Sequence, residues 1–228
     1  MAEADLFHEK WGVSLTYSFG VRDDLFSLMD LSLEGLRILE IGCACGATLM
    51  EIGARNPSAK LYGVELNERA AEIARTYADV LAMDVERVDE NDIRERFDYI
   101  LMPDVIEHLL DPWTALRNMR KLLAPGGCIV ASIPNVAHIS NLYHLLRGMW
   151  QYEDAGLLDR THFRFFTQRE IALMFEGAGL RIEDMMLRRF EMPAPIMELR
   201  RELLSLQSIK VRPEDLDAYQ WCVRARRE

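Results

Sequence analysis

The sequence predicts a doubly wound α/β domain, in which helices cover both faces of a largely parallel sheet. Short apolar runs alternate with helix-like stretches from residue 37 onward, as in consecutive strand–helix–strand units. Half of the 228 residues are hydrophobic, which is enough to build a buried core and excludes a disordered chain. No run of about 18 apolar residues is present, so no membrane-spanning helix is expected.

Five runs are predicted to be buried parallel strands, because they are nearly continuous in apolar residues and rich in β-branched ones. In chain order they span 37–41, 60–65, 79–83, 97–102 and 128–133. Helical patterns lie between them at 47–55, 68–77 and 113–122, so right-handed crossovers join successive strands. Two later apolar runs, 181–190 and 219–226, could complete the sheet.

Four carboxylates stand where the first four strands are expected to end. Glu40 closes the first strand, before a glycine-containing loop at 42–46 that leads into a helix. Glu65, Asp84 and Asp104 then follow at intervals of 19 and 20 residues. In a parallel sheet these ends share one edge, where ligands bind. Carboxylates there favour a ligand that carries hydroxyls, amines or positive charge, although each acid alone could also be a helix N-cap.

Five motifs occur in a fixed order along this core: LEIGCACG (39–46), YGVEL (62–66), AMDVE (82–86), FDYILMPDVIEHL (97–109) and LLAPGGCIVASIPN (122–135). Together they resemble the class I S-adenosylmethionine-dependent methyltransferases over residues 36–180. The resemblance implies S-adenosylmethionine as cofactor and a Rossmann-like, seven-stranded mixed sheet whose last strand is antiparallel. Ala44 departs from the family pattern, which usually has glycine at this position.

The resemblance also implies a set of cofactor-binding residues. It puts Glu40 and the 42–46 loop near the methionine part of the cofactor, Glu65 on the ribose and Asp84 near the adenine. The full predicted set is Glu40, Gly42, Cys43, Ala44, Gly46, Glu65, Leu66, Asp84, Val85, Pro103 and Asp104. Cys43 and Cys45 are interpreted as small residues that fill a tight loop, because two cysteines alone supply too few metal ligands.

A narrower resemblance covers residues 14–30 and 132–167, which look like bacterial methyltransferases encoded beside sugar and surface-polysaccharide enzymes. It implies a small-molecule or sugar acceptor. We predict one domain, 1–228, because no Gly- or Ser-rich linker divides it. Its expected parts are a lid segment (1–30), a cofactor-binding core (36–134), an acceptor-side insertion (135–180), and C-terminal strands and helix (181–228). Aromatic residues in 11–30 and 138–166, with Tyr17 and Arg22 near the cofactor, are expected to form the acceptor pocket and part of the lid.

Methyl transfer to a hydroxyl needs a group that accepts its proton. The predicted catalytic residues are Glu107 and His108, directly after the fourth strand, and His162 in the segment 159–166. An extended backbone there would place His162, Arg164 and Phe166 on one face and bury Phe163 and Phe165 on the other.

Two catalytic arrangements, and a purely structural role for both histidines, remain open. In the first, His108 is the general base, Glu107 orients it and His162 holds the acceptor. In the second, these three residues and Asp104 bind a metal ion. Histidine is a poor ligand for Mg²⁺ and suits Zn²⁺, Mn²⁺ or Fe²⁺ better. Of the two arrangements, the one without a metal is preferred.

Three other function classes are weighed against a methyltransferase. A nicotinamide oxidoreductase is disfavoured because the G-x-G-x-x-G fingerprint and a Tyr-x-x-x-Lys pair are both missing. A metal-dependent RNA 2′-O-methyltransferase shares the D-x-x-E-H motif, but a net charge of −10 without a basic stripe argues against a nucleic-acid partner. A non-catalytic module that binds S-adenosylmethionine remains an alternative.

Cysteine usage and the N-terminal sequence bear on location. The four cysteines are too sparse for a disulfide framework, and the polar, acidic N-terminus does not resemble a secretory signal. The expected location is therefore the cytoplasm. The sequence leaves the oligomeric state open.

Overall fold

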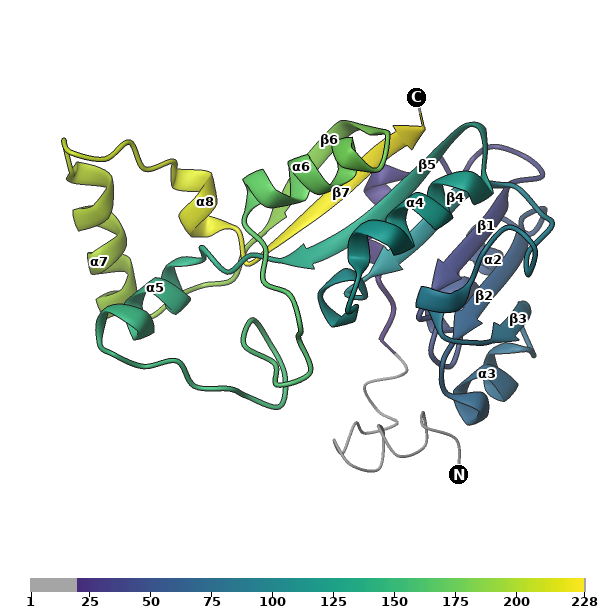
Figure 1. The fold of residues 1–228 in the computed structure, drawn as a ribbon, viewed down its shortest axis with the longest axis horizontal. Coiled ribbons are helices and arrows are strands. Elements are labelled where there is room, and N and C mark those ends of the chain that lie inside the picture. Colours follow the sequence, from purple (N-terminus) through teal and green to yellow (C-terminus); the bar gives the residue numbers. More distant parts are fainter. Residues whose placement is uncertain (1–19, 228) are drawn as a thin grey trace.

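Seven strands form one mixed sheet in the order β3-β2-β1-β4-β5-β7-β6 in the computed structural model, which describes residues 20–227 (Figure 1). The strands are β1 (Arg37–Ile41), β2 (Lys60–Glu65), β3 (Asp79–Ala82), β4 (Phe97–Pro103), β5 (Leu123–Pro134), β6 (Leu180–Arg188) and β7 (Gln220–Arg227). β1 to β5 pair in parallel, whereas β7 runs antiparallel to both β5 and β6. The predicted fold class is confirmed, including the antiparallel last strand.

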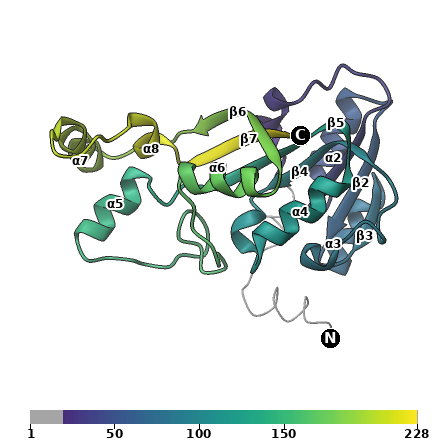
Figure 2. The same cartoon turned by 45° about the horizontal axis from the view of Figure 1, so that its top comes forward.

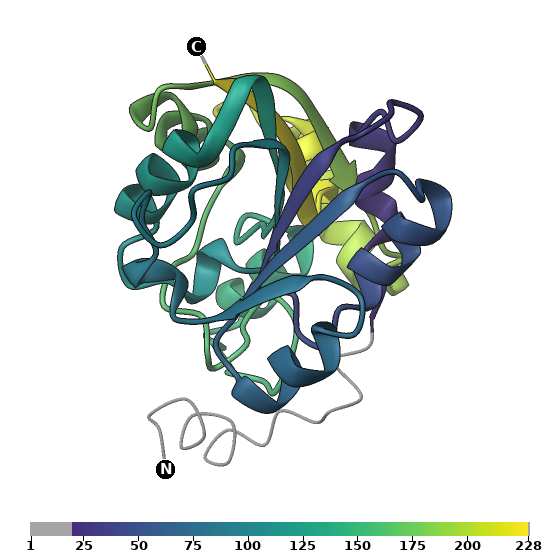
Figure 3. The same cartoon turned by 90° about the vertical axis from the view of Figure 1, so that its right-hand side faces the viewer.

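Helices cover both faces of the sheet, and Figure 3 shows the sheet between them. The α-helices are α2 (Ala47–Arg55), α3 (Glu68–Ala74), α4 (Pro112–Leu122), α5 (Ile139–Leu146), α6 (Gln168–Gly177), α7 (Ala194–Ser205) and α8 (Pro213–Asp217). Short 3₁₀ turns are η2 (Asp23–Leu28), η3 (Val85–Arg87) and η4 (Ile106–His108). Among the described residues, no helix combines the length and the apolar character that a bilayer crossing requires.

Alternation along the strands sends side chains into two separate cores. On β4, Ile100 and Met102 pack with α4 and α6 on one face of the sheet. Tyr99 and Leu101 pack on the opposite face, where η2 and α2 contribute Phe26 and other apolar side chains. Because both faces of the strand are covered, its sequence is almost continuously apolar.

Capping residues decide where the crossover helices begin. The Asp111 side chain accepts from the Thr114 N–H at 3.0 Å and starts α4, with Pro112 in its first turn. Asn67 caps α3 in the same way, through the Ala70 N–H at 3.1 Å. These caps fix the connections that leave the carboxyl ends of β2 and β4 at one edge of the sheet.

The insertion after β5 does not form one long helix. α5 ends at Leu146, close to Gly148, which has a φ of 74° that favours glycine. α5 packs with α7 and α8 around a small core of Ile139, Ile196 and Leu216. Figures 1 and 2 both show these three helices beyond one end of the sheet, away from α2 and α3.

Candidate active site

The loop between β1 and α2 is held in place by Glu65 at the end of β2. One carboxylate oxygen of Glu65 accepts from the Ala44 N–H at 2.9 Å, and the other accepts from the Asn67 N–H at 2.7 Å. Gly46, with a φ of 80°, starts α2. A Cβ atom at Gly63 would lie 2.6 Å from the Cys43 sulfur, so the loop packs directly on the β2 backbone.

Both cysteines of this loop are buried. Burial raises the pKa of the Cys43 thiol, and the nearby Glu40 carboxyl adds to the effect. A protonated, enclosed thiol is inert. The sequence interpretation of Cys43 and Cys45 as residues that fill a tight turn therefore agrees with their surroundings.

Glu40 is a buried acid behind the same loop. Its side chain is 3% exposed, and its Oε2 atom has no hydrogen-bond partner. Burial raises the pKa of Glu40 to about 8, and the Glu65 carboxylate adds to the shift. An unpartnered carboxyl oxygen at this edge suits a ligand that carries an amine.

Asp84 follows β3 and caps the short turn η3. It accepts from the Glu86 N–H at 2.9 Å, and its side chain is partly exposed beside Arg87. The N-cap interpretation therefore holds for this residue. Its neighbour Val85 packs against the main core, and Leu66, after β2, is exposed.

Asp104 lies at the centre of a ring of polar side chains beyond β4. It accepts from the Arg22 guanidinium, from the Ser132 hydroxyl at 2.7 Å and from the Gln220 amide at 2.8 Å. Arg22 also forms an ion pair with Asp24 at 2.9 Å. Arg188 completes the ring, because it donates to the side-chain oxygen of Gln220 at 3.2 Å. The backbone of Asp104 has a φ of 52°, a strained value for a residue other than glycine.

The N-terminal segment reaches this polar ring through Arg22, and its expected role as a lid stays a prediction. Trp11 and Tyr17, the other lid residues expected there, lie outside the described residues. Ser132 and Gln220 were missed by the sequence reasoning. Both stand inside or beside apolar strand runs, so no spacing or composition marks them as site residues.

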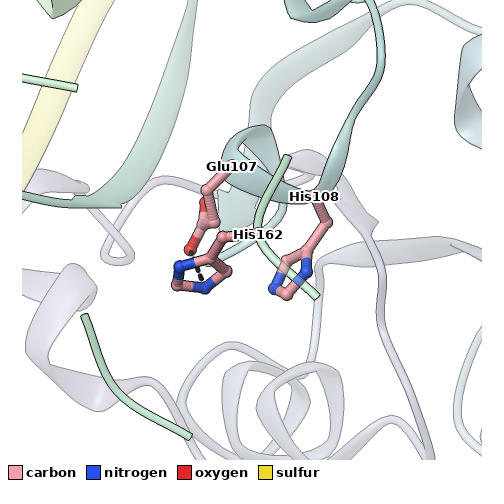
Figure 4. Close-up of side chains that lie close together, drawn as sticks. All are labelled: Glu107, His108 and His162. Atoms are coloured by element: carbon pink, nitrogen blue, oxygen red, sulfur yellow. Dashed lines mark ion pairs between the residues drawn. The ribbon is translucent and has the colours of Figure 1, made fainter. Parts of the chain in front are cut away.

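Glu107, His108 and His162 come together just after β4, on η4 and the insertion (Figure 4). Ligand-type atoms of all three lie within 4.8 Å of one another, and the two imidazole rings are 4.8 Å apart between centroids. Glu107 Oε1 is 4.0 Å from His162 Nε2. The two histidines are thus close enough to flank a single hydroxyl group.

All three groups of this cluster favour their neutral forms. Glu107 is 1% exposed, neither carboxyl oxygen has a partner, and burial, then the nearby Asp104, raises its pKa well above the usual range. Burial lowers the pKa of His108, and it lowers that of His162 to about 4. At neutral pH the two imidazoles are uncharged, and burial shifts the Glu107 carboxyl beside them toward its protonated form.

Two details of the predicted arrangement are wrong. Glu107 does not orient His108, because it faces His162, and the His108 ring nitrogen Nδ1 instead contacts Thr161. The segment 159–166 is not a regular extended strand: Phe163 is 49% exposed, whereas Phe166 is buried. The Phe163 and Arg164 N–H groups both donate to the Glu107 carbonyl, at 2.9 and 3.1 Å, which turns the chain and breaks the alternation.

The sequence is similar to a described protein family and to curated enzymes. A family model described as a methyltransferase domain matches residues 21–184. A ubiquinone biosynthesis O-methyltransferase of Cereibacter sphaeroides (strain ATCC 17025) is 38% identical over 157 residues, which cover 66% of this chain and 62% of that enzyme. The enzyme of the same name from Nitrobacter winogradskyi is 32% identical over 166 residues, covering 67% and 59%. The chain spans about three fifths of the length of these relatives.

Solved structures share the fold at low sequence identity. An S-adenosylmethionine-dependent methyltransferase from Archaeoglobus fulgidus matches with a TM-score of 0.62 and 18% identity, covering 97% of this chain and 98% of that one. The N-methyltransferase NodS from Bradyrhizobium japonicum, in complex with S-adenosyl-L-homocysteine, matches with a TM-score of 0.57 and 20% identity, covering 90% and 86%.

Proposed function

The chain belongs to the methyltransferase-domain family, whose cofactor is S-adenosylmethionine, and from this premise we propose that it methylates a hydroxyl oxygen of a small molecule. The observation that carries the proposal is the partly buried pair of neutral imidazoles just after β4. A neutral imidazole can accept the hydroxyl proton that O-methylation releases. The relatives named as O-methyltransferases support the same reaction.

The residues at the sheet edge fit the cofactor. Asp104 and Arg22 form an ion pair whose two signs complement a zwitterionic methionine group, and Glu40 offers an unpartnered oxygen beside them. Glu65 uses each carboxylate oxygen once, so lone pairs remain for ribose hydroxyls. We assign the other predicted contacts to the walls of the same site: Gly42, Cys43, Ala44, Gly46, Leu66, Asp84, Val85 and Pro103.

Bound S-adenosylmethionine supplies a methyl group on a positively charged sulfur. The protein must hold the acceptor oxygen in line with that methyl and accept the acceptor's proton. We assign the proton to His108, and we assign acceptor binding to His162 and Glu107, which face each other at 4.0 Å. Glu107 is buried and both histidines are partly buried, and a site that admits little water favours the charge dispersal of the reaction.

A metal-assisted version of the reaction is the second candidate, because the oxygens of Glu107 have no partner and two histidines lie beside them. Asp104 is already occupied by Arg22, Ser132 and Gln220, so it is not free to join such a site. One carboxylate and two imidazoles suit Zn²⁺, Mn²⁺ or Fe²⁺ better than Mg²⁺.

Turnover with labelled S-adenosylmethionine tests both versions. Acceptors should include sugars, quinone precursors and RNA. We expect small hydroxylated molecules to be methylated, and we expect His108→Ala to lower kcat by about 10² or more. His144→Ala, an exposed histidine on α5, is the matched control and should leave the rate unchanged.

Exhaustive chelation separates the two versions. A rate that survives chelation but collapses in His108→Ala supports the general base, whereas loss on chelation and recovery with added Zn²⁺ or Mn²⁺ supports the metal. Binding of S-adenosylmethionine without turnover on any acceptor would favour the non-catalytic module. A cytoplasmic location and a sugar-type acceptor remain predictions from the sequence.

A further inference from the structure

His108 is held by two oxygens of a single residue on the insertion. Its Nδ1 atom lies 3.2 Å from the Thr161 carbonyl oxygen and 3.1 Å from the Thr161 hydroxyl oxygen. A carbonyl oxygen can only accept a hydrogen bond. The contact with the carbonyl alone therefore favours a proton on Nδ1.

Asp159 fixes the direction of the Thr161 hydroxyl. Its Oδ1 atom accepts from the Thr161 hydroxyl at 2.6 Å and from the Thr161 N–H at 2.8 Å. The hydroxyl proton points to Asp159, so a lone pair of the hydroxyl oxygen faces His108. Both groups that contact Nδ1 are thus acceptors, and Nδ1 must be the protonated nitrogen.

We propose that Asp159 and Thr161 are positioning residues that fix His108 in the Nδ1–H tautomer, so that its Nε2 lone pair is free to accept the acceptor's proton. We call this chain of hydrogen bonds from Asp159 through Thr161 to His108 the relay. Its role in catalysis rests on the function proposed above. The relay joins two segments that are far apart in sequence: η4 carries the base, and the insertion selects its tautomer.

The backbone supports the relay independently of the Asp159 side chain. The Glu153 N–H donates to the Leu158 carbonyl at 3.0 Å, and the Arg160 N–H donates to the Glu153 carbonyl at 3.0 Å. These bonds close the loop around Asp159. A substitution of this side chain should therefore alter the hydroxyl direction while the loop keeps its course.

The tautomer can be observed directly by ¹⁵N NMR of the full chain labelled in its histidine rings. The His108 signals are identified by their loss in His108→Gln. We expect a protonated Nδ1 and a bare Nε2 at neutral pH in the unsubstituted protein. In Asp159→Ala the freed hydroxyl can donate to Nδ1, so the Nε2–H tautomer should become populated and kcat should fall about ten-fold with little change in KM.

Two further variants separate the effect of the Thr161 hydroxyl on the tautomer from an effect of Asp159 on the loop. Asp159→Asn keeps an acceptor oxygen at the same place and should retain the Nδ1–H tautomer. Asp159→Ala combined with Thr161→Val removes the competing hydroxyl. This double variant should restore the Nδ1–H tautomer, because the backbone carbonyl at position 161 remains. A role of Asp159 in loop stability alone would not be repaired by this second change.

A bare Nδ1 in the unsubstituted protein would overturn the relay, and so would an unchanged His108 tautomer in Asp159→Ala. Neither result depends on turnover. Undiminished methyl transfer by His108→Gln would instead overturn the proposed role of His108 as the base. The ¹⁵N spectra would still show whether Asp159 and Thr161 fix the tautomer of His108.

Discussion

Glu65 has two tasks, because its carboxylate holds the β1–α2 loop and is the expected partner of the cofactor ribose. We predict that Glu65→Ala weakens binding of both S-adenosylmethionine and its demethylated product by roughly 1.5–3 kcal/mol, the usual contribution of hydrogen bonds to a charged group. Isothermal titration measures the effect. Glu68→Ala removes a neighbouring, exposed carboxylate that pairs with Arg75 and should leave affinity unchanged. Equal affinities for the protein and Glu65→Ala would remove Glu65 from the site.

The pH dependence of turnover should reflect the buried state of His108. In its proposed role as the base, His108 works only when it is neutral, and burial lowers its pKa below the ordinary value of 6.5. We therefore expect the fall of kcat/KM at acid pH, where His108 becomes protonated, to have its midpoint below 6.5. Initial rates across that range check this. An acid limb centred above 6.5 would contradict a desolvated base.

Individual site residues could be predicted only where a motif marks them. Glu40, Glu65, Asp104 and the Glu107–His108 pair stand at strand ends, so the sheet topology brings them to one edge. Thr161 carries no such signal. Its importance comes from a contact across 53 positions of sequence, which depends on how the insertion folds back.

The β1–α2 loop contains an avoidable strain at Ala44, whose φ of 47° lies in the left-handed region. We predict that Ala44→Gly raises the free energy of unfolding by up to about 1 kcal/mol, because the relief of backbone strain exceeds the entropy that glycine adds to the unfolded chain. Ala54→Gly, in the last turn of α2, should lower it by up to about 1 kcal/mol. Denaturant unfolding of the two variants compares the same substitution at the two positions. A loss of stability in Ala44→Gly would show that the loop is not strained.

Elements that are defined by their own sequence were predicted well. β1 and β2 begin and end where the apolar runs do, and α2 matches its helical pattern. The segment 159–166 was predicted poorly, because hydrogen bonds to the Glu107 carbonyl determine its course. Such bonds to a distant part of the chain leave no periodic trace in the sequence.

The stability of the whole molecule should depend on pH through Glu40. Its pKa rises from 4.5 to about 8 on folding, so its contribution to stability is complete below pH 4.5 and is lost as the pH rises toward 8. Glu40→Gln cannot ionise. We predict that at pH 7 the free energy of unfolding of this variant exceeds that of the unsubstituted protein by up to about 3 kcal/mol. Near pH 4 the two free energies should converge.

Denaturant unfolding at both pH values measures this difference. The control is Glu72→Gln, which changes an exposed carboxylate on α3 and should show no comparable gain. The same Glu40→Gln change should weaken cofactor binding if the carboxyl serves the methionine amine. A variant that gains nothing at pH 7 would show that Glu40 is already ionised in the folded protein.

The position of β7 affects how the chain folds during its synthesis. β7 is the last strand in chain order, yet it lies between β5 and β6, and Cys128 pairs with Arg226. When the ribosome has released β6, the strand that must join it to the sheet has still to appear. Until residues 220–227 emerge, β5 and β6 each present an unpaired edge to their surroundings. Closure of the sheet therefore has to follow the emergence of β7.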